Sequence, residues 1–188
     1  MSEDEARRAA DLIERIGRLI QAEEQKSPLN PAQWEALRYL EKANRFSRTP
    51  AALAEYLGST RGTVSQTLIA LEKKGCVERR QSTRDRRSVD MTLTDAGRAQ
   101  LAEDPLREFA AHIAATGTDG TLEEALSAVL HEAILQNRSK SFGICATCRF
   151  FRRDERAGDR TMPHRCALLD VPLSDDDSGR ICAEQEPA

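Results

Sequence analysis

The sequence has few aromatic residues and no long apolar run. Only 4% of its 188 residues are aromatic and 31% are charged, which suits a helical protein with a modest core better than an all-β protein. Charges interrupt residues 1–20, so this segment reads as neither a signal peptide nor a membrane span, and no later stretch has the apolar length of a span. We therefore expect a cytoplasmic protein without a membrane partner.

Residues that typically build catalytic sites are also scarce. The three histidines (His112, His131 and His164) are scattered along the chain, and there is no glycine-rich loop of the kind that binds nucleotides. We therefore expect that the protein is not an enzyme. Before residue 145 the only cysteine is Cys76, and four more follow before the end of the chain.

Capping signals divide the first 75 residues into four expected helices. Residues 4–26 place apolar side chains on one face of a helix. Asn30-Pro31 and Thr49-Pro50 each combine a good N-cap with a proline in the first turn, and Thr60 is placed to cap a further helix. The expected buried positions of the later helices are Trp34, Leu37, Leu40, Val64, Leu68 and Leu71.

After Gly75 the pattern changes to alternating apolar and polar residues. Residues 76–81 and 88–94 predict two strands, and the polar segment between them predicts a hairpin with a basic tip. Residues 77–88 contain five arginines against two acids, a local balance of +3 in a chain whose net charge is −3. A further helix should begin after Thr94 and be interrupted at Asp104-Pro105, and residues 121–138 should form the last long helix.

A short helix, a turn with glycine, a second helix and a basic hairpin together describe a winged helix-turn-helix. The expected fold class is therefore mainly α with a small β-hairpin wing (α+β). The second helix of such a unit fits the major groove of double-stranded DNA, where the N-terminal residues of the helix face the base edges. The arginines of the hairpin are suited to the flanking backbone or the minor groove.

Three segments resemble the MarR family of bacterial transcription regulators. They are, in order, PAQWEALRYL, LAEYLGSTRGTVSQTLIALEKKGCVERR and DRRSVDMTLTDAGRAQL, and the resemblance spans about residues 5–138. It implies a homodimer whose terminal helices interlock and whose two winged helices bind the halves of a palindromic operator.

The resemblance also implies roles for individual residues. Base and phosphate contacts from the second helix fall to Arg61, Thr63, Ser65 and Gln66. In the wing, Asp85-Arg86-Arg87-Ser88 matches the Asp-x-Arg-Ser motif of the family. Arg87 is then the minor-groove arginine, positioned by Asp85, while Arg84 and Arg86 contact the DNA backbone.

The terminal helices carry more apolar surface than a small winged helix can cover. These faces contain Leu12, Ile16 and Leu19 at one end and Leu126, Val129 and Leu130 at the other. We interpret them as a dimer interface, and two-fold symmetry then predicts two half-sites about one helical turn apart.

The last four cysteines follow the spacing C-x2-C-x17-C-x15-C, formed by Cys145, Cys148, Cys166 and Cys182. In a reducing compartment such a group is more typical of a metal site or a redox pair than of structural disulfides. A tail of this length should be too short to bury free thiols. A Cys-x-x-Cys pair closed by two distant cysteines suits either tetrahedral zinc or an iron–sulphur cluster.

The tail is similar to the high-potential iron–sulphur proteins, through CATCRFF and RCALLDVPLSDDDSGRICAE. This resemblance implies a 4Fe-4S cluster held by the four cysteines, with zinc as the alternative. Few aromatic residues follow Cys148, so we expect a thin hydrophobic cage. His164 lies two residues before Cys166 and is a second candidate ligand, although a supporting role for it is favoured.

We expect two domains, a winged-helix and dimerisation domain (1–138) and a cofactor-binding tail (139–188). The leading hypothesis is a transcription regulator whose cluster senses redox or iron status. A second keeps the DNA binding but makes the tail a static zinc site, with a small molecule as effector. A third, an electron-transfer protein, is disfavoured by the lack of a catalytic constellation.

Overall fold

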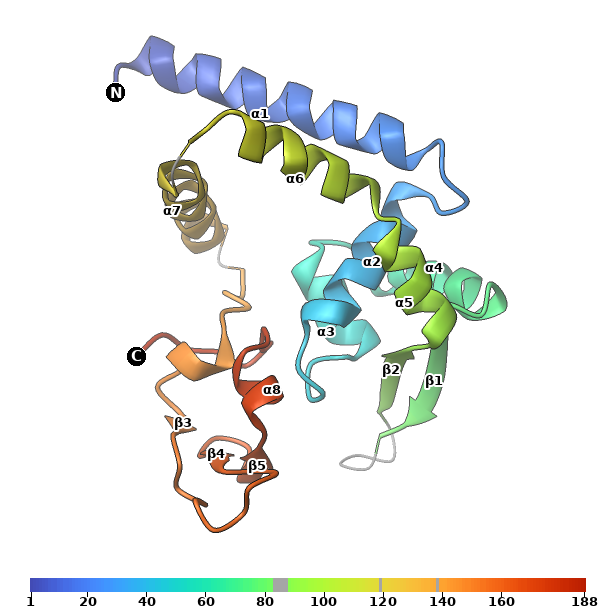
Figure 1. The fold of residues 1–188 in the computed structure, drawn as a ribbon, viewed down its shortest axis with the longest axis vertical. Coiled ribbons are helices and arrows are strands. Elements are labelled where there is room, and N and C mark those ends of the chain that lie inside the picture. Colours follow the sequence, from blue (N-terminus) through green and yellow to red (C-terminus); the bar gives the residue numbers. More distant parts are fainter. Residues whose placement is uncertain (83–87, 119, 138) are drawn as a thin grey trace.

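Four helices occupy the first 75 residues, as the capping signals predict. They are α1 (Glu3–Glu24), α2 (Pro31–Lys42), α3 (Pro50–Tyr56) and α4 (Arg61–Lys73) in the computed structural model, which describes all residues except 83–87, 119 and 138 (Figure 1). The side chains of Asn30, Thr49 and Thr60 accept hydrogen bonds from backbone amides in the first turns of α2, α3 and α4, which confirms the three expected N-caps.

The hairpin consists of β1 (Val77–Gln81) and β2 (Val89–Leu93), paired antiparallel with Val77 opposite Leu93. The amide of Met91 also donates to the carbonyl of Arg48 at 2.7 Å, so the segment before α3 joins the hairpin. The expected winged helix is therefore present, while the tip at 83–87 lies outside the described residues.

The core of the winged helix lies where α2, α3, α4 and the hairpin meet. The side chains expected there are all buried: Trp34, Leu37, Leu40, Val64, Leu68 and Leu71. Cys76 and Met91 add the inner face of the hairpin to the same cluster. Apolar residues recur with a period of 3.6 along the helices and of 2 along the strands, so on each element they share the face that points into the core.

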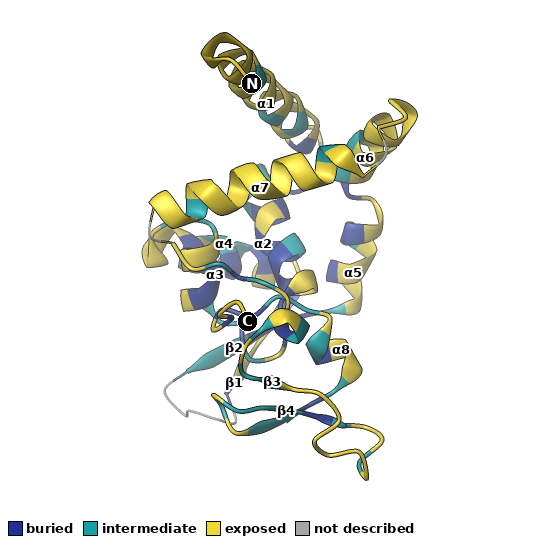
Figure 2. Cartoon of the chain, turned by 90° about the vertical axis from the view of Figure 1, so that its left-hand side faces the viewer, coloured by how far each residue is buried: buried dark blue, intermediate teal, exposed yellow. Residues whose placement is uncertain are grey.

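Three helices follow the wing. Asp104 caps α6 (Pro105–Ala115) and separates it from α5 (Asp95–Ala102), so the expected interruption is a complete break between two helices. Helices α1 and α6 pack side by side (Figure 1). Helix α7 (Thr121–Gln136) has no buried residue and is almost entirely exposed (Figure 2). In the described ranges no helix has both the length and the apolar character to cross a membrane.

The tail forms a small folded unit. A 3-10 turn η1 (Cys145–Thr147) is followed by a three-stranded antiparallel sheet and a short helix. The sheet has the order β3-β4-β5, with bounds β3 (Phe151–Arg152), β4 (His164–Cys166) and β5 (Val171–Leu173), and the helix is α8 (Asp175–Ser178).

The tail packs against the winged helix. Phe142 and Ala183 are each 7% exposed and belong to the main core, and Phe142 lies edge-on to Tyr56 with ring centroids 5.2 Å apart. The expectation that this tail is too short to bury its thiols is wrong for Cys145 and Cys182, which are buried, whereas Cys148 and Cys166 are half-buried. The reason is that the winged helix supplies part of the surface that covers Cys145 and Cys182. The boundary at residue 138 remains a prediction, but the tail is not a detached appendage.

Candidate DNA interface and cysteine cluster

The N-terminal part of α4 presents the expected DNA-reading face. Val64 and Leu68 point into the core, which turns the opposite side of the helix outward. Gln66 lies on that side and is exposed, Arg61 and Thr63 are exposed in the first turn, and Ser65 is half-buried. The four expected contact residues therefore share one helix start, and Ser65 has the least accessible side chain of them.

Thr63 also takes part in the cap of α4. Its hydroxyl lies 2.8 Å from the hydroxyl of Thr60, and its amide donates to the same Thr60 oxygen at 3.1 Å. Because hydroxyls both donate and accept, Thr63 keeps hydrogen-bonding capacity for a DNA phosphate or base. Phosphate is also favoured at this helix start by the free amides of the first turn.

The described part of the wing is basic but partly neutralised. Arg79 and Arg80 are exposed on β1, and Arg80 pairs with Glu78 at 2.5 Å, while Arg79 lies 3.9 Å from Glu72. The four expected wing contacts (Arg84, Asp85, Arg86 and Arg87) lie outside the described residues, and their roles stay predictions.

The four tail cysteines lie near one another. Cys145 and Cys182 form a small core with Leu173, against which Phe46, Phe151, Cys166 and Val171 pack. Burial raises the pKa of the Cys145 thiol to about 12, and the negative charges of the Cys182, Cys166 and Cys148 thiolates contribute to the same shift.

Backbone hydrogen bonds hold the segments that carry these cysteines. The amide of Cys148 donates to the carbonyl of Cys145 at 3.0 Å and closes η1, and the amide of Cys182 donates to Gly143 at 3.0 Å. The amide of Leu169 donates to the sulphur of Cys166 at 3.5 Å. Hydrogen bonds of this last kind stabilise a thiolate and tune a metal bound to it.

The donor set suits iron or zinc, because cysteine thiolates are ligands of zinc and of iron–sulphur clusters. Within the part of the chain that the structure describes, however, no three His, Cys, Asp or Glu side chains have the arrangement of ligands around a metal ion. The structure brings Cys145, Cys166 and Cys182 into one cluster, and the binding of a cofactor by the four thiols stays a prediction. The hydrophobic cage is more extensive than expected, since Phe46 of the winged helix adds to it.

His164 is 3% exposed, and both of its ring nitrogens have partners. Nδ1 accepts a hydrogen bond from the amide of Asp154 at 3.0 Å, so the ring proton is assigned to Nε2, which donates to a carboxylate oxygen of Asp175 at 3.0 Å. The first bond connects β4 to the turn after β3, and the second connects β4 to α8. The supporting role expected for His164 agrees with this geometry, because a metal would have to displace one of the two bonds.

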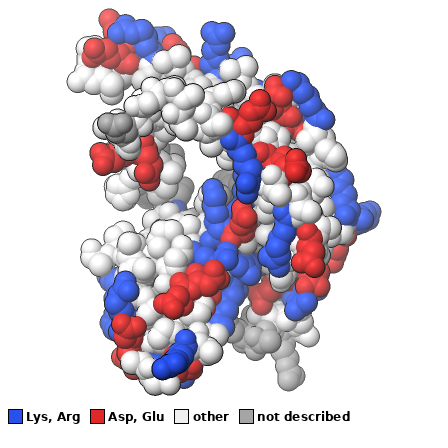
Figure 3. Space-filling view, in the orientation of Figure 1, with Lys and Arg blue, Asp and Glu red and all other residues white. Residues whose placement is uncertain are grey.

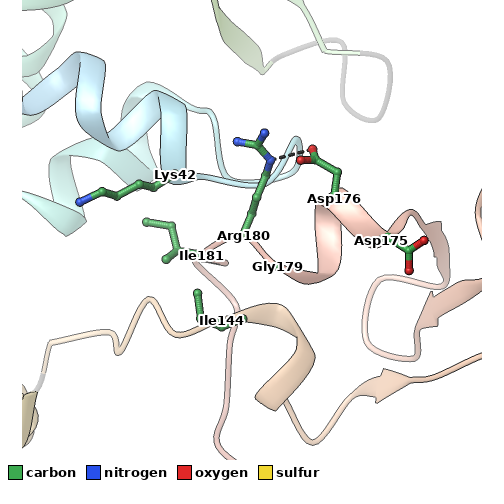
Figure 4. Close-up of a pocket in the computed structure, with 7 residues that line it drawn as sticks. All are labelled: Lys42, Ile144, Asp175, Asp176, Gly179, Arg180 and Ile181. Carbon is green, nitrogen blue, oxygen red and sulfur yellow. Dashed lines mark hydrogen bonds and ion pairs between the residues drawn. The ribbon is translucent and has the colours of Figure 1, made fainter. Parts of the chain in front are cut away.

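Contacts between the tail and the α2–α3 loop were not predicted. The amide of Ile181 donates to Lys42 at 3.0 Å and its carbonyl accepts from Asn44 at 2.9 Å, while the amide of Ala183 donates to the Ser47 hydroxyl at 2.9 Å. Figure 4 shows the cavity of about 420 Å³ at this junction, with Arg180 bound to Asp176 beside it. No local pattern in the sequence signals such a pairing.

The comparisons with known proteins agree with this geometry. Residues 27–88 match the family model described as MarR family. This segment is similar to the winged helix of MarR-family proteins. Over 92 residues the chain is 34% identical to the transcriptional repressor MprA of Escherichia coli, an alignment that covers 49% of this chain and 50% of the repressor. The chain therefore spans about half the length of the curated relatives it matches.

Solved structures share the fold of the winged helix and its flanking helices. The transcriptional regulator BldR of Sulfolobus solfataricus has a TM-score of 0.56 at 24% identity, covering 73% of this chain and 99% of that one. CouR of Rhodococcus jostii, bound to p-coumaroyl-CoA, has a TM-score of 0.54 at 22% identity, with 65% and 88% covered. The MepR–DNA complex of S. aureus has a TM-score of 0.54 at 20% identity, with 68% and 96% covered. At these identities the likeness shows the fold alone.

Proposed function

We propose that the chain is a DNA-binding transcription regulator that acts as a homodimer and holds an iron–sulphur cluster on its tail. The exposed start of α4 beside a basic hairpin carries the DNA-binding part of the proposal. A helix presented in this way enters the major groove, and the wing adds contacts to the flanking backbone. The MepR–DNA complex, which has the same fold, supports a duplex as the partner.

The homodimer is supported by apolar surface that the single chain leaves uncovered. Leu12 and Leu19 on α1 are 61% and 58% exposed, and Val129 and Leu130 on α7 are 56% and 61% exposed. Burying each such side chain contributes about 1.5–3 kcal/mol, so leaving them all in water is unfavourable. A second copy brings the same helices to cover them, and two-fold symmetry then suits a palindromic operator.

The cofactor is proposed from the donor set. Three of the four thiols (Cys145, Cys166 and Cys182) meet in a small core that excludes water from Cys145 and Cys182, and the thiol of Cys166 accepts a backbone N–H hydrogen bond. Cys148 is held beside this core by the hydrogen bond from its amide to the carbonyl of Cys145. When bound, a 4Fe-4S cluster supplies one-electron redox chemistry, and zinc on the same thiols supplies none. We therefore propose that Cys145, Cys148, Cys166 and Cys182 hold the cluster and that the regulator senses redox or iron status.

The coupling from tail to DNA follows the α2–α3 loop rather than the dimerisation helices. Ile181 and Ala183 bind this loop directly on either side of Cys182. The loop continues through Arg48, whose carbonyl binds the hairpin, into Thr49, the N-cap of α3. A change in the packing of the tail is therefore transmitted to the helix-turn-helix and the wing of the same protomer.

A second candidate is a regulator with a zinc-bound tail and a small-molecule effector. A cavity of about 280 Å³ between α1 and α6 favours it, with Leu19, Phe109 and His112 among its lining residues. A ligand in this cavity would alter the angle between the two helices and so the distance between the two winged helices of a dimer.

The test uses the full chain, purified without oxygen, with an operator selected from random duplexes. Iron, sulphide and zinc are measured on the same preparations that are titrated with DNA. We expect about four iron and four sulphide per chain, and loss of both in single Ser variants at Cys145, Cys148, Cys166 or Cys182. Operator affinity should then change by about 5–150-fold, the usual size of an allosteric coupling.

Cys76→Ser is the matched control, since Cys76 is buried in the wing core away from the other thiols. It should retain iron, sulphide and operator affinity. Zinc at about one per chain without iron would favour the second candidate. Loss of the cofactor with unchanged operator affinity would refute the sensor, and failure to select any duplex would refute the DNA-binding function.

A further inference from the structure

A small cavity of about 130 Å³ lies where the tail, the wing and α2 meet. Its lining residues are Leu40, Glu41, Arg48, Leu93, Arg98 and Arg180. Three of these are arginines and one is an acid, and they come from parts of the chain that are far apart in sequence. Figure 3 shows the charged side chains that gather along the seam between the tail and the winged helix.

Arg48 has the least compensated charge of the three. It is half-buried, its Nε donates to the carbonyl of Ala43 at 3.0 Å, and in the described ranges it has no ion pair. Two acids lie near it, but both are engaged: Asp176 with Arg180 at 2.7 Å and Asp177 with Arg45 at 3.4 Å. The acid that lines the cavity, Glu41, is exposed and forms no ion pair with Arg48 in the described ranges. A partly buried cation without an ion-pair partner is unfavourable, so a bound anion would stabilise Arg48.

The pKa of Arg48 is lowered by the same two features of its surroundings, burial and neighbouring positive charge. Burial lowers it first, and the positive charge of Arg180 lowers it further, while Asp176 and Asp177 raise it and Arg98 lowers it again. The net direction is downward, which means that the surroundings of this guanidinium are more cationic and drier than water.

The other two arginines leave donors available. Arg98 donates to the carbonyl of Leu93 at 3.1 Å, and its acid neighbour, exposed Asp95, is 3.9 Å away. Arg180 binds the carbonyl of Glu41 as well as Asp176. A guanidinium carries five N–H donors, and among the described residues Arg48 and Arg98 each use one of theirs in a hydrogen bond to the protein.

We propose that this cavity binds one small oxyanion, a phosphate or carboxylate group, clasped by Arg48, Arg98 and Arg180. The guanidinium fork matches the paired oxygens of such groups. The volume equals that of about four water molecules at ~30 Å³ each, which accommodates inorganic phosphate. It is well below the ~300 Å³ at which pockets for drug-sized ligands begin, so only a small anion or the terminal group of a larger one enters.

The bound anion would join three functional segments. Arg48 immediately precedes Thr49, the N-cap of α3; Arg98 binds the end of β2 through Leu93; and Arg180 lies two residues before Cys182. The anion therefore fastens the tail to the helix-turn-helix and the wing. This role does not depend on which cofactor the cysteines hold.

The test is calorimetric titration of the full chain with sodium phosphate, against sodium acetate, at constant ionic strength and without DNA. We expect saturable binding at one site per chain and a rise in the unfolding temperature with phosphate. Arg48→Gln should weaken binding at least about tenfold, because it removes a charged partner from the site. Tighter binding of acetate than of phosphate would identify a carboxylate as the ligand group.

Two further variants make the result specific. Arg98→Gln, whose side chain is 62% exposed in the native protein, should fold normally and also weaken phosphate binding. Arg8→Gln, on the exposed surface of α1, should leave it unchanged. No saturable binding, or equal binding by all three variants, would overturn the proposal. Competition of phosphate with a duplex, with equal weakening of duplex binding in Arg48→Gln, would instead make the site a DNA-backbone contact and would also overturn it.

Discussion

Replacing Arg38 by Met should break the charged link between the winged helix and helices α1 and α6, and so destabilise the fold. Arg38 on α2 binds Glu24, at the end of α1, at 2.6 Å, and both oxygens of Asp104, the N-cap of α6, at 2.7 and 2.5 Å. The side chains of Arg38, Glu24 and Asp104 are only 13%, 3% and 9% exposed. This network is the charged link between α2 and the two helices that carry the proposed dimer interface.

The magnitude follows from what the substitution leaves behind. Met keeps most of the aliphatic packing of Arg38 but leaves two buried carboxylates without their cation, and breaking a buried pair in this way costs about 3–5 kcal/mol. For a chain of this length about 2–4 °C of unfolding temperature corresponds to each kcal/mol, so we expect a fall of about 6–20 °C. Urea denaturation measures the same loss in the free energy of unfolding. The variants are compared at one protein concentration, because the apparent stability of a dimer rises with protein concentration.

The pH dependence has a defined sign. Burial raises the pKa of Asp104, but the hydrogen bonds from Arg38 and from the Leu106 amide outweigh it, and the net pKa lies below 3.8. A carboxyl with a lowered folded pKa stabilises the protein above its unfolded value, and this contribution disappears as the pH falls through the folded pKa. The stability difference between the wild type and Arg38→Met should therefore narrow below about pH 4.

The control is Arg18→Met on α1, which removes the exposed ion pair of Arg18 with Glu14, also on α1. Pairs of this kind contribute about 0.3–0.5 kcal/mol, so this variant should unfold almost like the wild type. The reasoning would be refuted if Arg38→Met lost less than about 1 kcal/mol at neutral pH, or if the difference did not narrow in acid.

Three other changes test separate parts of the structure. Gly97→Ala places a Cβ 2.1 Å from the carbonyl oxygen of Cys76, so α5 must shift; we expect a loss of about 1–3 kcal/mol or more in a thermal melt, and an unchanged melt would contradict the close approach. Phe142→Ala removes an aromatic side chain from the main core, at about 3–5 kcal/mol, and should speed hydrogen exchange across the tail (residues 139–188), whereas native protection would show that the tail docks without it. Arg87→Ala should reduce the log–log salt slope of operator binding by about one unit in a mobility-shift titration without altering the melt, and an unchanged slope would remove this residue from the interface.

The sequence by itself determined the local structure of the winged helix. Asn30, Thr49 and Thr60 act on amides three residues away, so their effect is visible in a short window of sequence. The change of period after Gly75 likewise marks the end of α4 and the start of β1. The spacing of apolar residues along each helix and strand then identified the core residues, because the spacing on one element alone decides which side chains share a face.

Contacts between distant segments were decided only by the tertiary structure. Ile181 pairs with Asn44, and Arg38 with Asp104, across stretches of chain in which no spacing or repeat connects the partners. For the same reason the sequence could not show the burial of Cys145 and Cys182: Phe46, which packs against them, belongs to a loop of the winged helix about 100 residues earlier. That the four tail cysteines form one site stays a prediction. A cysteine spacing specifies donors, whereas burial depends on whatever surface the completed fold brings against them.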